Sequence, residues 1–285
     1  MKTFLLMKRL CQSRCSRKRM IRGMVLGYDT QSWQNFRVKV PVTIILPKKN
    51  SNILIAGKSG SGKSLSARYY LYQILHNRES YVCMADYKAG EEYEALEGSP
   101  SYASGENAFQ MLDTFYQFFN EVRKKRIRLK KHYTLFIEEW SGLLTYAENQ
   151  SKKQKTDIMA KIGEILAVGR GLNIGIILCV QRADASYFSA GTRDQFQVVI
   201  SFGRCSAEQF RMLGFHGELE ENPTANYKSG QALVLVDGQE AIREITVPWI
   251  LNEKELCQQI RYLLDRQPDL TALYRAAAEG RSTVK

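Results

Sequence analysis

The sequence has no apolar run approaching the roughly 18 residues that span a bilayer. Lys8 and Arg9 interrupt the apolar residues 4–7 before they reach the length of a signal-peptide core. The 6 cysteines contain no C-x-x-C pair, and the 3 histidines are scattered, so neither disulfides nor a zinc site are expected. We predict a cytoplasmic protein with no membrane segment of its own.

Acidic residues are scarce in two parts of the chain, although its 285 residues, 44% apolar and 25% charged, have an ordinary globular composition. Residues 1–24 hold eight lysines and arginines and no acidic residue, and a second basic cluster covers residues 123–131. Both could follow the phosphates of a nucleic acid. The alternatives are a disordered basic tail and a solvated helix end, where cations also favour the helix dipole.

Residues 53–64, ILIAGKSGSGKS, are an apolar strand pattern that runs into glycines and ends on Lys-Ser. This fits the phosphate-binding loop G-x-x-x-x-G-K-[ST], and apolar residues at helical spacing follow it. Backbone N–H groups would surround a polyphosphate, Lys63 would neutralise it and the Ser64 hydroxyl would hold Mg²⁺. ATP and Mg²⁺ are therefore the expected cofactors. The predicted nucleotide-binding residues are Gly57, Lys58, Ser59, Gly60, Ser61, Gly62, Lys63 and Ser64.

Strand and helix patterns alternate on both sides of this loop. Short extended segments at residues 36–40 and 42–46, separated by Pro41, indicate an edge ribbon ahead of the loop strand. Residues 80–86 are another candidate strand, and the alternation continues to about Val180. This order predicts an α/β fold with a mainly parallel central sheet flanked by helices.

A second candidate site lies where the β-branched and aromatic run of residues 133–137 ends on Glu138 and Glu139. This is the form of a Walker B strand. Glu138 would face the Mg²⁺ shell, and Glu139 would accept a proton from, or polarise, the water that attacks the γ-phosphate. Taken alone, an acidic pair at a strand end could equally be solvated, and the preceding phosphate loop favours the catalytic interpretation.

A third candidate is Gln181, which follows the apolar run of residues 174–180. An amide can donate to a phosphate and accept from the attacking water, which suits a γ-phosphate sensor. A single glutamine at a strand end is a weak signal. The prediction rests on its position after the phosphate loop and the acidic pair in the chain.

Together these elements resemble the FtsK/HerA superfamily of DNA-pumping ATPases over most of residues 52–238. Residues 86–88, DYK, are similar to the family's D-P-K, and residues 135–143 to its hydrophobic-D-E-hydrophobic block. Residues 169–182, GRGLNIGIILCVQR, closely resemble GRAAGIHLVLATQR, and residues 200–234 resemble the motifs that follow. The resemblance implies a RecA-like P-loop NTPase that assembles as a homo-hexamer around duplex DNA.

The chain departs from the family at Glu138, which replaces an aspartate, and at Tyr87, which replaces a proline. Nothing after Pro248 resembles a winged-helix DNA-reading domain. The compact form resembles the coupling or transfer ATPases of conjugative and integrative elements, which implies a relaxase or replication-initiation partner. A DNA translocase and a nucleotide-dependent adaptor that docks DNA-processing proteins both remain open, since Glu138 leaves the Mg²⁺ geometry undecided.

We expect three segments: a basic tail (1–26), an ATPase motor domain (27–250) and a helical tail (251–285). Residues 251–264 have an amphipathic helical pattern that favours packing on the core over contact with a partner. In a ring motor, an arginine from one subunit would contact the γ-phosphate held by the next. Arg170, Arg182 and Arg211 are the candidates for this role, with Arg170 first, and a surface or intrasubunit salt bridge is the alternative.

Overall fold

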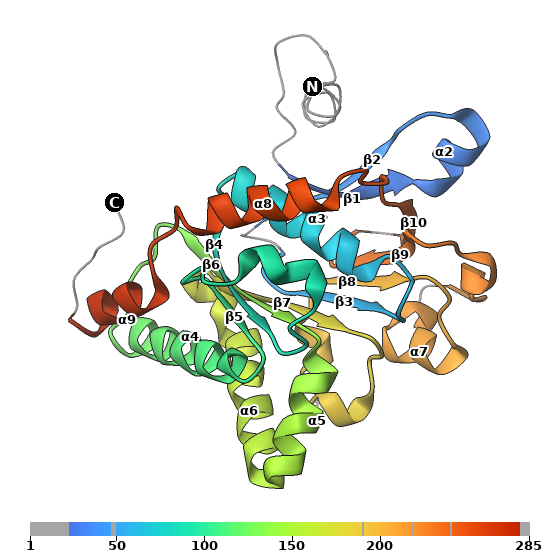
Figure 1. Ribbon diagram of the computed structural model, residues 1–285. Coiled ribbons are helices and arrows are strands. Elements are labelled where there is room, and N and C mark those ends of the chain that lie inside the picture. Colours follow the sequence, from blue (N-terminus) through green and yellow to red (C-terminus); the bar gives the residue numbers. More distant parts are fainter. Residues whose placement is uncertain (1–22, 47–49, 190, 218, 240, 280–285) are drawn as a thin grey trace.

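A central sheet of ten strands organises the computed structural model, which describes residues 23–46, 50–189, 191–217, 219–239 and 241–279 (Figure 1). The strand order is β2-β1-β10-β9-β8-β3-β7-β6-β4-β5. The strands are β1 (Met24–Asp29), β2 (Pro41–Ile44), β3 (Ile53–Gly57), β4 (Ser80–Asp86), β5 (Tyr102–Ser104), β6 (His132–Glu138), β7 (Ile174–Val180), β8 (Val198–Phe202), β9 (Gln231–Val236) and β10 (Arg243–Thr246).

From β8 to β5 in this order every neighbouring pair is parallel, and β9, β10, β1 and β2 extend the sheet with antiparallel pairs. The predicted α/β class with a mainly parallel sheet is confirmed. Because the carboxyl ends of parallel strands share one edge, β3, β4, β6 and β7 all deliver the residues that follow them to the same side of the molecule.

Helices cover both faces of the sheet (Figure 1). They are α2 (Thr30–Phe36), α3 (Lys63–His76), α4 (Asn107–Lys124), α5 (Trp140–Gln150), α6 (Lys152–Val168), α7 (Ala207–Met212), α8 (Glu253–Leu264) and α9 (Leu270–Ala278). The alternation of β3 divides the core, because Ile53 and Ile55 pack with α3 and α8, and Leu54 packs on the side of α4, α5, α6 and α9. The expected packing of residues 251–264 is confirmed, since α8 buries Leu256 and Ile260.

The predicted strand at residues 36–40 was wrong. Helix α2 occupies Thr30–Phe36, and residues 37–40 are irregular. The helix begins where the Asp29 carboxylate accepts the Ser32 N–H at 2.8 Å, and it ends at Arg37, which has a φ of 56°. The N-cap therefore outweighed the alternating pattern of the last residues. Pro41 opens β2 at the edge of the sheet, where a missing N–H is tolerated.

The predicted basic tail falls mainly on residues 1–22, which lie outside the described residues. Strand β1 already begins at Met24, so residues 24–26 form part of the sheet. None of the helices in the described ranges is both long enough and apolar enough to cross a membrane.

Candidate functional site

The loop between β3 and α3 forms a tight cradle of backbone. Gly60 and Gly62 have φ values of 78° and 88°, which favour glycine. A Cβ on Gly62 would come within 2.7 Å of the Gly230 nitrogen, and one on Gly57 within 2.7 Å of the Ser61 Oγ. Gly230 also donates its N–H to the Ser61 carbonyl at 2.9 Å. The glycines thus let the loop close against the segment that precedes β9.

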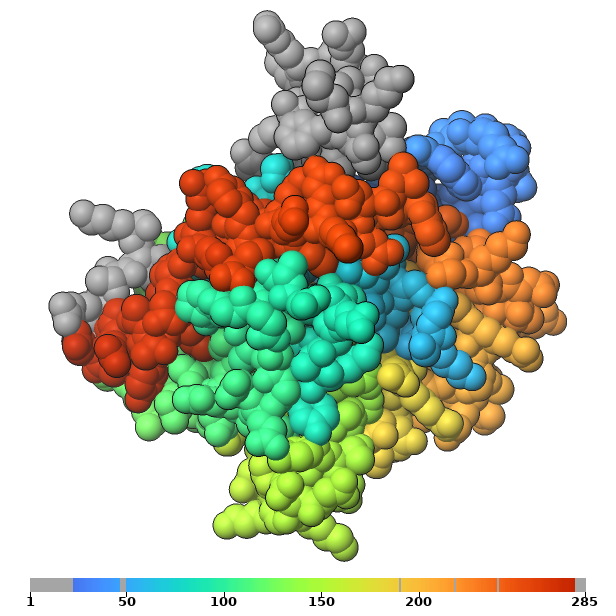
Figure 2. All heavy atoms as spheres, viewed as in Figure 1, coloured from blue at the N-terminus to red at the C-terminus, as the bar shows by residue number. Residues whose placement is uncertain are grey.

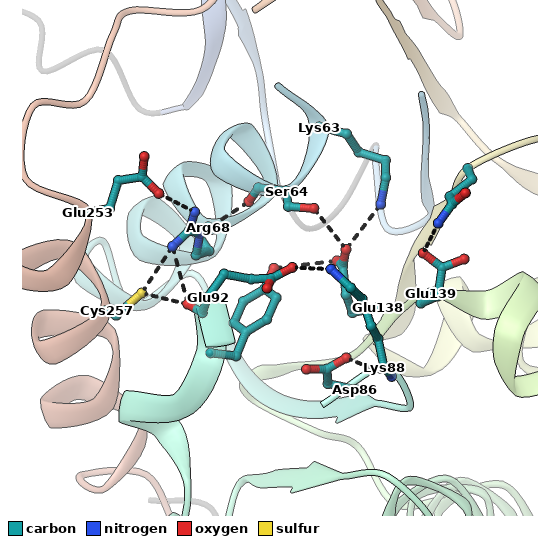
Figure 3. Close-up of polar contacts among 12 residues, drawn as sticks. Lys63, Ser64, Arg68, Asp86, Lys88, Glu92, Glu138, Glu139, Glu253 and Cys257 are labelled. Atoms are coloured by element: carbon teal, nitrogen blue, oxygen red, sulfur yellow. Dashed lines mark hydrogen bonds and ion pairs between the residues drawn. The ribbon is translucent and has the colours of Figure 1, made fainter. Parts of the chain in front are cut away.

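Lys63 opens α3 and points at the end of β6 (Figure 3). Its Nζ lies 3.0 Å from the Glu138 Oε1, and both side chains are buried. Burial lowers the pKa of Lys63, but the charge of Glu138 and its hydrogen bond to the lysine, together with weaker interactions with Cys179 and Glu139, outweigh burial, and the pKa is raised. The lysine is therefore a fixed positive charge at the mouth of the glycine loop.

The loop has the chemistry that a polyphosphate and Mg²⁺ require. The Ser61 Oγ is buried and lacks a hydrogen-bond partner in the described structure, which leaves one donor free inside the cradle. The Ser64 hydroxyl donates to the Glu138 Oε1 at 3.4 Å, so two hard oxygen donors meet beside Lys63. Mg²⁺ in phosphate sites takes only one or two protein oxygens, with phosphate and water completing the shell. Ser64 and Glu138 would hold it.

Glu139 lies beside Glu138 in sequence but faces a different partner. Its φ of 55° places it in the left-handed region, so the chain turns sharply between β6 and α5. Its Oε2 accepts from the Gln181 Nε2 at 3.0 Å, and its Oε1 accepts from the Ser141 Oγ at 2.6 Å. A strained backbone at such a point is typical of functional sites. The Glu138 carboxylate therefore faces Lys63, and the Glu139 carboxylate faces Gln181.

Parallel pairing brings these residues together, since β7 lies between β3 and β6. Gln181 leaves β7 between the phosphate loop and the acidic pair. Arg170 is not part of this cluster within the chain. It lies in the short helix η2 (Gly169–Leu172), before β7 and therefore at the opposite edge of the sheet, where its side chain is exposed.

Two further buried groups, which the sequence did not place in the site, adjoin Glu138. Asp86 ends β4 directly across from Glu138, and its Oδ2 accepts from the Tyr102 hydroxyl at 3.0 Å. Burial raises the pKa of Asp86 to about 6. Tyr93, in the short helix η1 (Glu91–Leu96), donates its hydroxyl to the Glu138 Oε2 at 3.4 Å. The D-P-K-like residues marked Asp86, whereas no local pattern marked Tyr93.

No protein-family model matches this sequence, and no curated protein does so either. Solved structures do match. The cytoplasmic domain of the type VII secretion ATPase EccC from Thermomonospora curvata aligns with a TM-score of 0.62 and 17% identity, over 90% of this chain and 32% of that chain. The pCW3 conjugation coupling protein TcpA aligns with a TM-score of 0.59 and 19% identity, over 86% and 71%.

A third neighbour is the genome packaging NTPase B204 from Sulfolobus turreted icosahedral virus 2, with a TM-score of 0.51, 18% identity and coverage of 72% and 99%. The structural neighbours are FtsK/HerA-type P-loop ATPases. The chain has their RecA-like fold. The resemblance drawn from residues 86–88, 135–143 and 169–182 is thus confirmed at the level of the fold, and the chain spans only about a third of the EccC chain.

Proposed function

We propose that this protein is an ATP hydrolase that uses ATP to move or transfer DNA. The observation that carries the proposal is the convergence, at one edge of the sheet, of a glycine cradle with Lys63, an acidic pair, and Gln181. These are the parts that phosphoryl transfer from a nucleoside triphosphate to water requires. ATP is the proposed nucleotide, and the TcpA structure is described as a complex with the ATP analogue ATPγS.

The residues divide the reaction between them. The backbone of the glycine loop and Lys63 bind the β- and γ-phosphates and hold the phosphorus in line with a water molecule. Glu139 takes the proton of that water as its oxygen bonds to the γ-phosphorus and the bond to the β–γ bridging oxygen breaks. Gln181 orients the water through its amide. Mg²⁺ held by Ser64 and Glu138 would neutralise charge on the phosphate oxygens.

Two hydrogen bonds of the site would change when the nucleotide binds. Lys63 is paired with Glu138, and Gln181 is paired with Glu139, so the phosphates would compete with Glu138 for Lys63. The Gln181 amide must likewise turn from Glu139 toward the γ-phosphate and the water. Nucleotide binding would thus replace the Lys63–Glu138 and Gln181–Glu139 hydrogen bonds with bonds to the phosphates and the water.

DNA is the proposed polymer substrate, with the duplex form favoured. Two of the structural neighbours are a conjugation coupling protein and a viral genome packaging NTPase, which supports a genetic polymer as the substrate. In this chain the exposed cations Arg128 and Lys130 lie at the amino edge of the sheet, on the loop that Asn173 joins to the start of β7 by donating its Nδ2 to the Leu129 carbonyl at 2.8 Å. Such a basic edge suits phosphate contacts.

Steady-state ATPase assays with and without duplex DNA test the proposal. A translocase should be stimulated many-fold by DNA, and single-stranded DNA of equal nucleotide concentration should stimulate less. ATP hydrolysis that DNA leaves unchanged would instead support the nucleotide-dependent adaptor. No hydrolysis and no nucleotide binding would overturn the proposed enzyme. A relaxase or replication-initiation protein is the proposed partner in either case, within a conjugative or mobile-element pathway.

We further propose that the protein works as a homo-hexamer in the cytoplasm, with Arg170 acting on the nucleotide of a neighbouring subunit. Its place at the amino edge keeps it from its own phosphate loop. Inactive Arg170→Ala protein mixed with inactive Lys63→Ala protein should then regain part of the activity, because some interfaces pair an intact loop with an intact arginine. Mixed rings that remain inactive at every ratio would remove Arg170 from this role.

A further inference from the structure

Arg68 is a buried cation in the second turn of α3, with a relative exposure of 5%. Its Nε donates to the Ser64 carbonyl at 3.4 Å, and its Nη1 donates to the Glu92 carbonyl at 3.2 Å. Its Nη2 forms an ion pair with the Glu253 Oε2 of α8 at 2.6 Å, and the Cys257 Sγ lies 3.5 Å from Nη1. One guanidinium therefore joins α3, η1 and α8 (Figure 3).

Two of these connections continue toward the oxygens proposed to hold Mg²⁺. Ser64, whose carbonyl Arg68 holds, presents the hydroxyl that meets Glu138. The Glu92 carbonyl precedes Tyr93, and the Arg68 Cζ also lies 5.8 Å from the centre of the Tyr93 ring. The Tyr93 hydroxyl in turn donates to the Glu138 Oε2 at 3.4 Å. Arg68 thus contacts Ser64 directly and Glu138 through Tyr93, and these contacts do not involve the glycines of the loop.

The choice of arginine fits this task. Its planar fork offers several donors at fixed angles, so one side chain can hold two carbonyls and a carboxylate at once, whereas a lysine presents a single point charge. In the space-filling view α8 lies along the η1 segment and α3, and it packs against both (Figure 2). The Glu253 side chain remains half-exposed, so the pair is open to solvent at this one end.

We propose that Arg68 is a positioning residue for Mg²⁺: it fixes Ser64 through its carbonyl and Glu138 through Tyr93, and α8 locks it in place. The inference rests on the proposed ATPase site. Loss of a group behind metal-holding residues typically lowers metal affinity about 10- to 100-fold. A purely structural arginine would instead change stability and leave the Mg²⁺ requirement unaltered.

The test is titration of a fluorescent ATP analogue at fixed concentrations of free Mg²⁺ and in excess EDTA. For Arg68→Lys we expect the Mg²⁺ concentration that gives half-maximal tight binding to rise about tenfold or more. Binding in EDTA, which depends on Lys63 and the glycine loop, should stay within about twofold of wild type. Arg261→Lys is the matched control, because Arg261 also joins α8 to the η1 segment, through the Glu97 carbonyl, but lies outside the contacts to Ser64 and Tyr93.

Tyr93→Phe provides a second variant that removes only the hydroxyl. It should raise the Mg²⁺ requirement by less than Arg68→Lys, because the contact to Ser64 remains. The double variant should resemble Arg68→Lys, because replacing Arg68 already removes the support of Tyr93. A lower melting temperature with an unchanged Mg²⁺ titration in Arg68→Lys and in Tyr93→Phe would overturn the inference. Absence of analogue binding by the wild-type protein, with or without Mg²⁺, would instead count against the proposed function.

Discussion

The two ends of β4 and β6 hold opposite kinds of polar cluster. At the amino edge Ser80 faces His132, and the Ser80 Oγ lies 3.0 Å from the His132 Nδ1. Burial lowers the pKa of His132 to about 4, so this cluster is uncharged at neutral pH. At the carboxyl edge Asp86 faces Glu138, and the buried ion pair with Lys63 adjoins them. The same two strands therefore begin on neutral groups and end on charges.

The difference teaches where this fold concentrates its chemistry. A buried charge is unfavourable unless it has a partner. At the carboxyl edge, the buried charges of Lys63 and Glu138 lie next to the glycine loop, where an ionic ligand can bind. The amino edge buries neutral groups, among them the His132 Nε2, which has no hydrogen-bond partner in the described structure, and it keeps its cations exposed. Reaction chemistry is thus expected at one edge, and surface electrostatics at the other.

Lys63→Ala should have the largest effect and abolish ATP hydrolysis. It removes the buried point charge that faces the phosphates and leaves Glu138 without its cation. Titration of a fluorescent ATP analogue should also show weaker binding. Lys152→Ala, at an exposed position in the first turn of α6, is the control and should retain hydrolysis within a few fold. Hydrolysis at the wild-type rate in Lys63→Ala would exclude this loop from the mechanism.

Glu139→Gln should bind ATP but hydrolyse it about a hundredfold more slowly, the usual scale for loss of a positioned base. Single-turnover hydrolysis measured beside nucleotide binding separates these two effects. Glu148→Gln, on the exposed side of α5, is the control because its ion pair with Lys155 is remote from the site. If Glu138→Gln is the slow, tightly binding variant and Glu139→Gln is not, the roles of the two carboxylates are reversed.

The sequence predicted the carboxyl edge well because its parts are local. The strand predicted at residues 80–86 is β4 with the same bounds, and the pattern of glycines followed by Lys63 and Ser64, with its strand and helix flanks, predicted the phosphate loop. Arg68, Tyr93 and Glu253 could not be found in this way. They lie far apart in sequence and meet only after η1 and α8 pack against α3, and no periodicity encodes that contact.

The sequence also does not show which residues of the basic cluster at 123–131 form ion pairs or hydrogen bonds. The structure separates them. Lys125 forms an ion pair with Glu121 at 3.2 Å, and Lys131 donates to the Arg78 carbonyl at 3.0 Å. Within the described part of the chain the exposed members without an ion pair include Lys124, Arg126, Arg128 and Lys130. Helix α4 ends at Lys124, so the last three lie on the loop to β6.

Replacing those four residues with glutamine should weaken DNA binding and flatten its salt dependence. Each phosphate contact that is lost should reduce the slope of log affinity against log salt by about 0.9. Fluorescence anisotropy with labelled duplex DNA over a series of salt concentrations measures the slope. The variant Lys125→Gln with Lys131→Gln, at the paired positions, should change it less. Equal slopes for the wild type and the fourfold variant would mean that these four residues face solvent and do not contact DNA phosphates.

His132 gives the smallest expected effect at neutral pH and tests the neutral edge directly. Its pKa of about 4 in the folded protein is below the 6.5 of an ordinary histidine, so the unfolded chain takes up the proton first as the pH falls. The stability that the neutral ring contributes is therefore fully present above about pH 6.5 and is lost as the pH falls toward 4. This loss should be at most about 3 kcal/mol. His132→Asn should lack it.

Urea unfolding of wild type and His132→Asn between pH 7.5 and 4.5 measures the difference, and subtracting the two profiles removes the contribution of Asp86 and other groups that both proteins share. His76→Asn, at an exposed position, is the control and should follow the wild-type profile. The free energies of wild type and His132→Asn should converge as the pH falls, because protonation removes the advantage of the neutral ring. A constant difference across this range would mean that His132 titrates alike in the folded and unfolded chains. The amino edge would then tolerate charge, and the contrast between the two edges would be one of exposure alone.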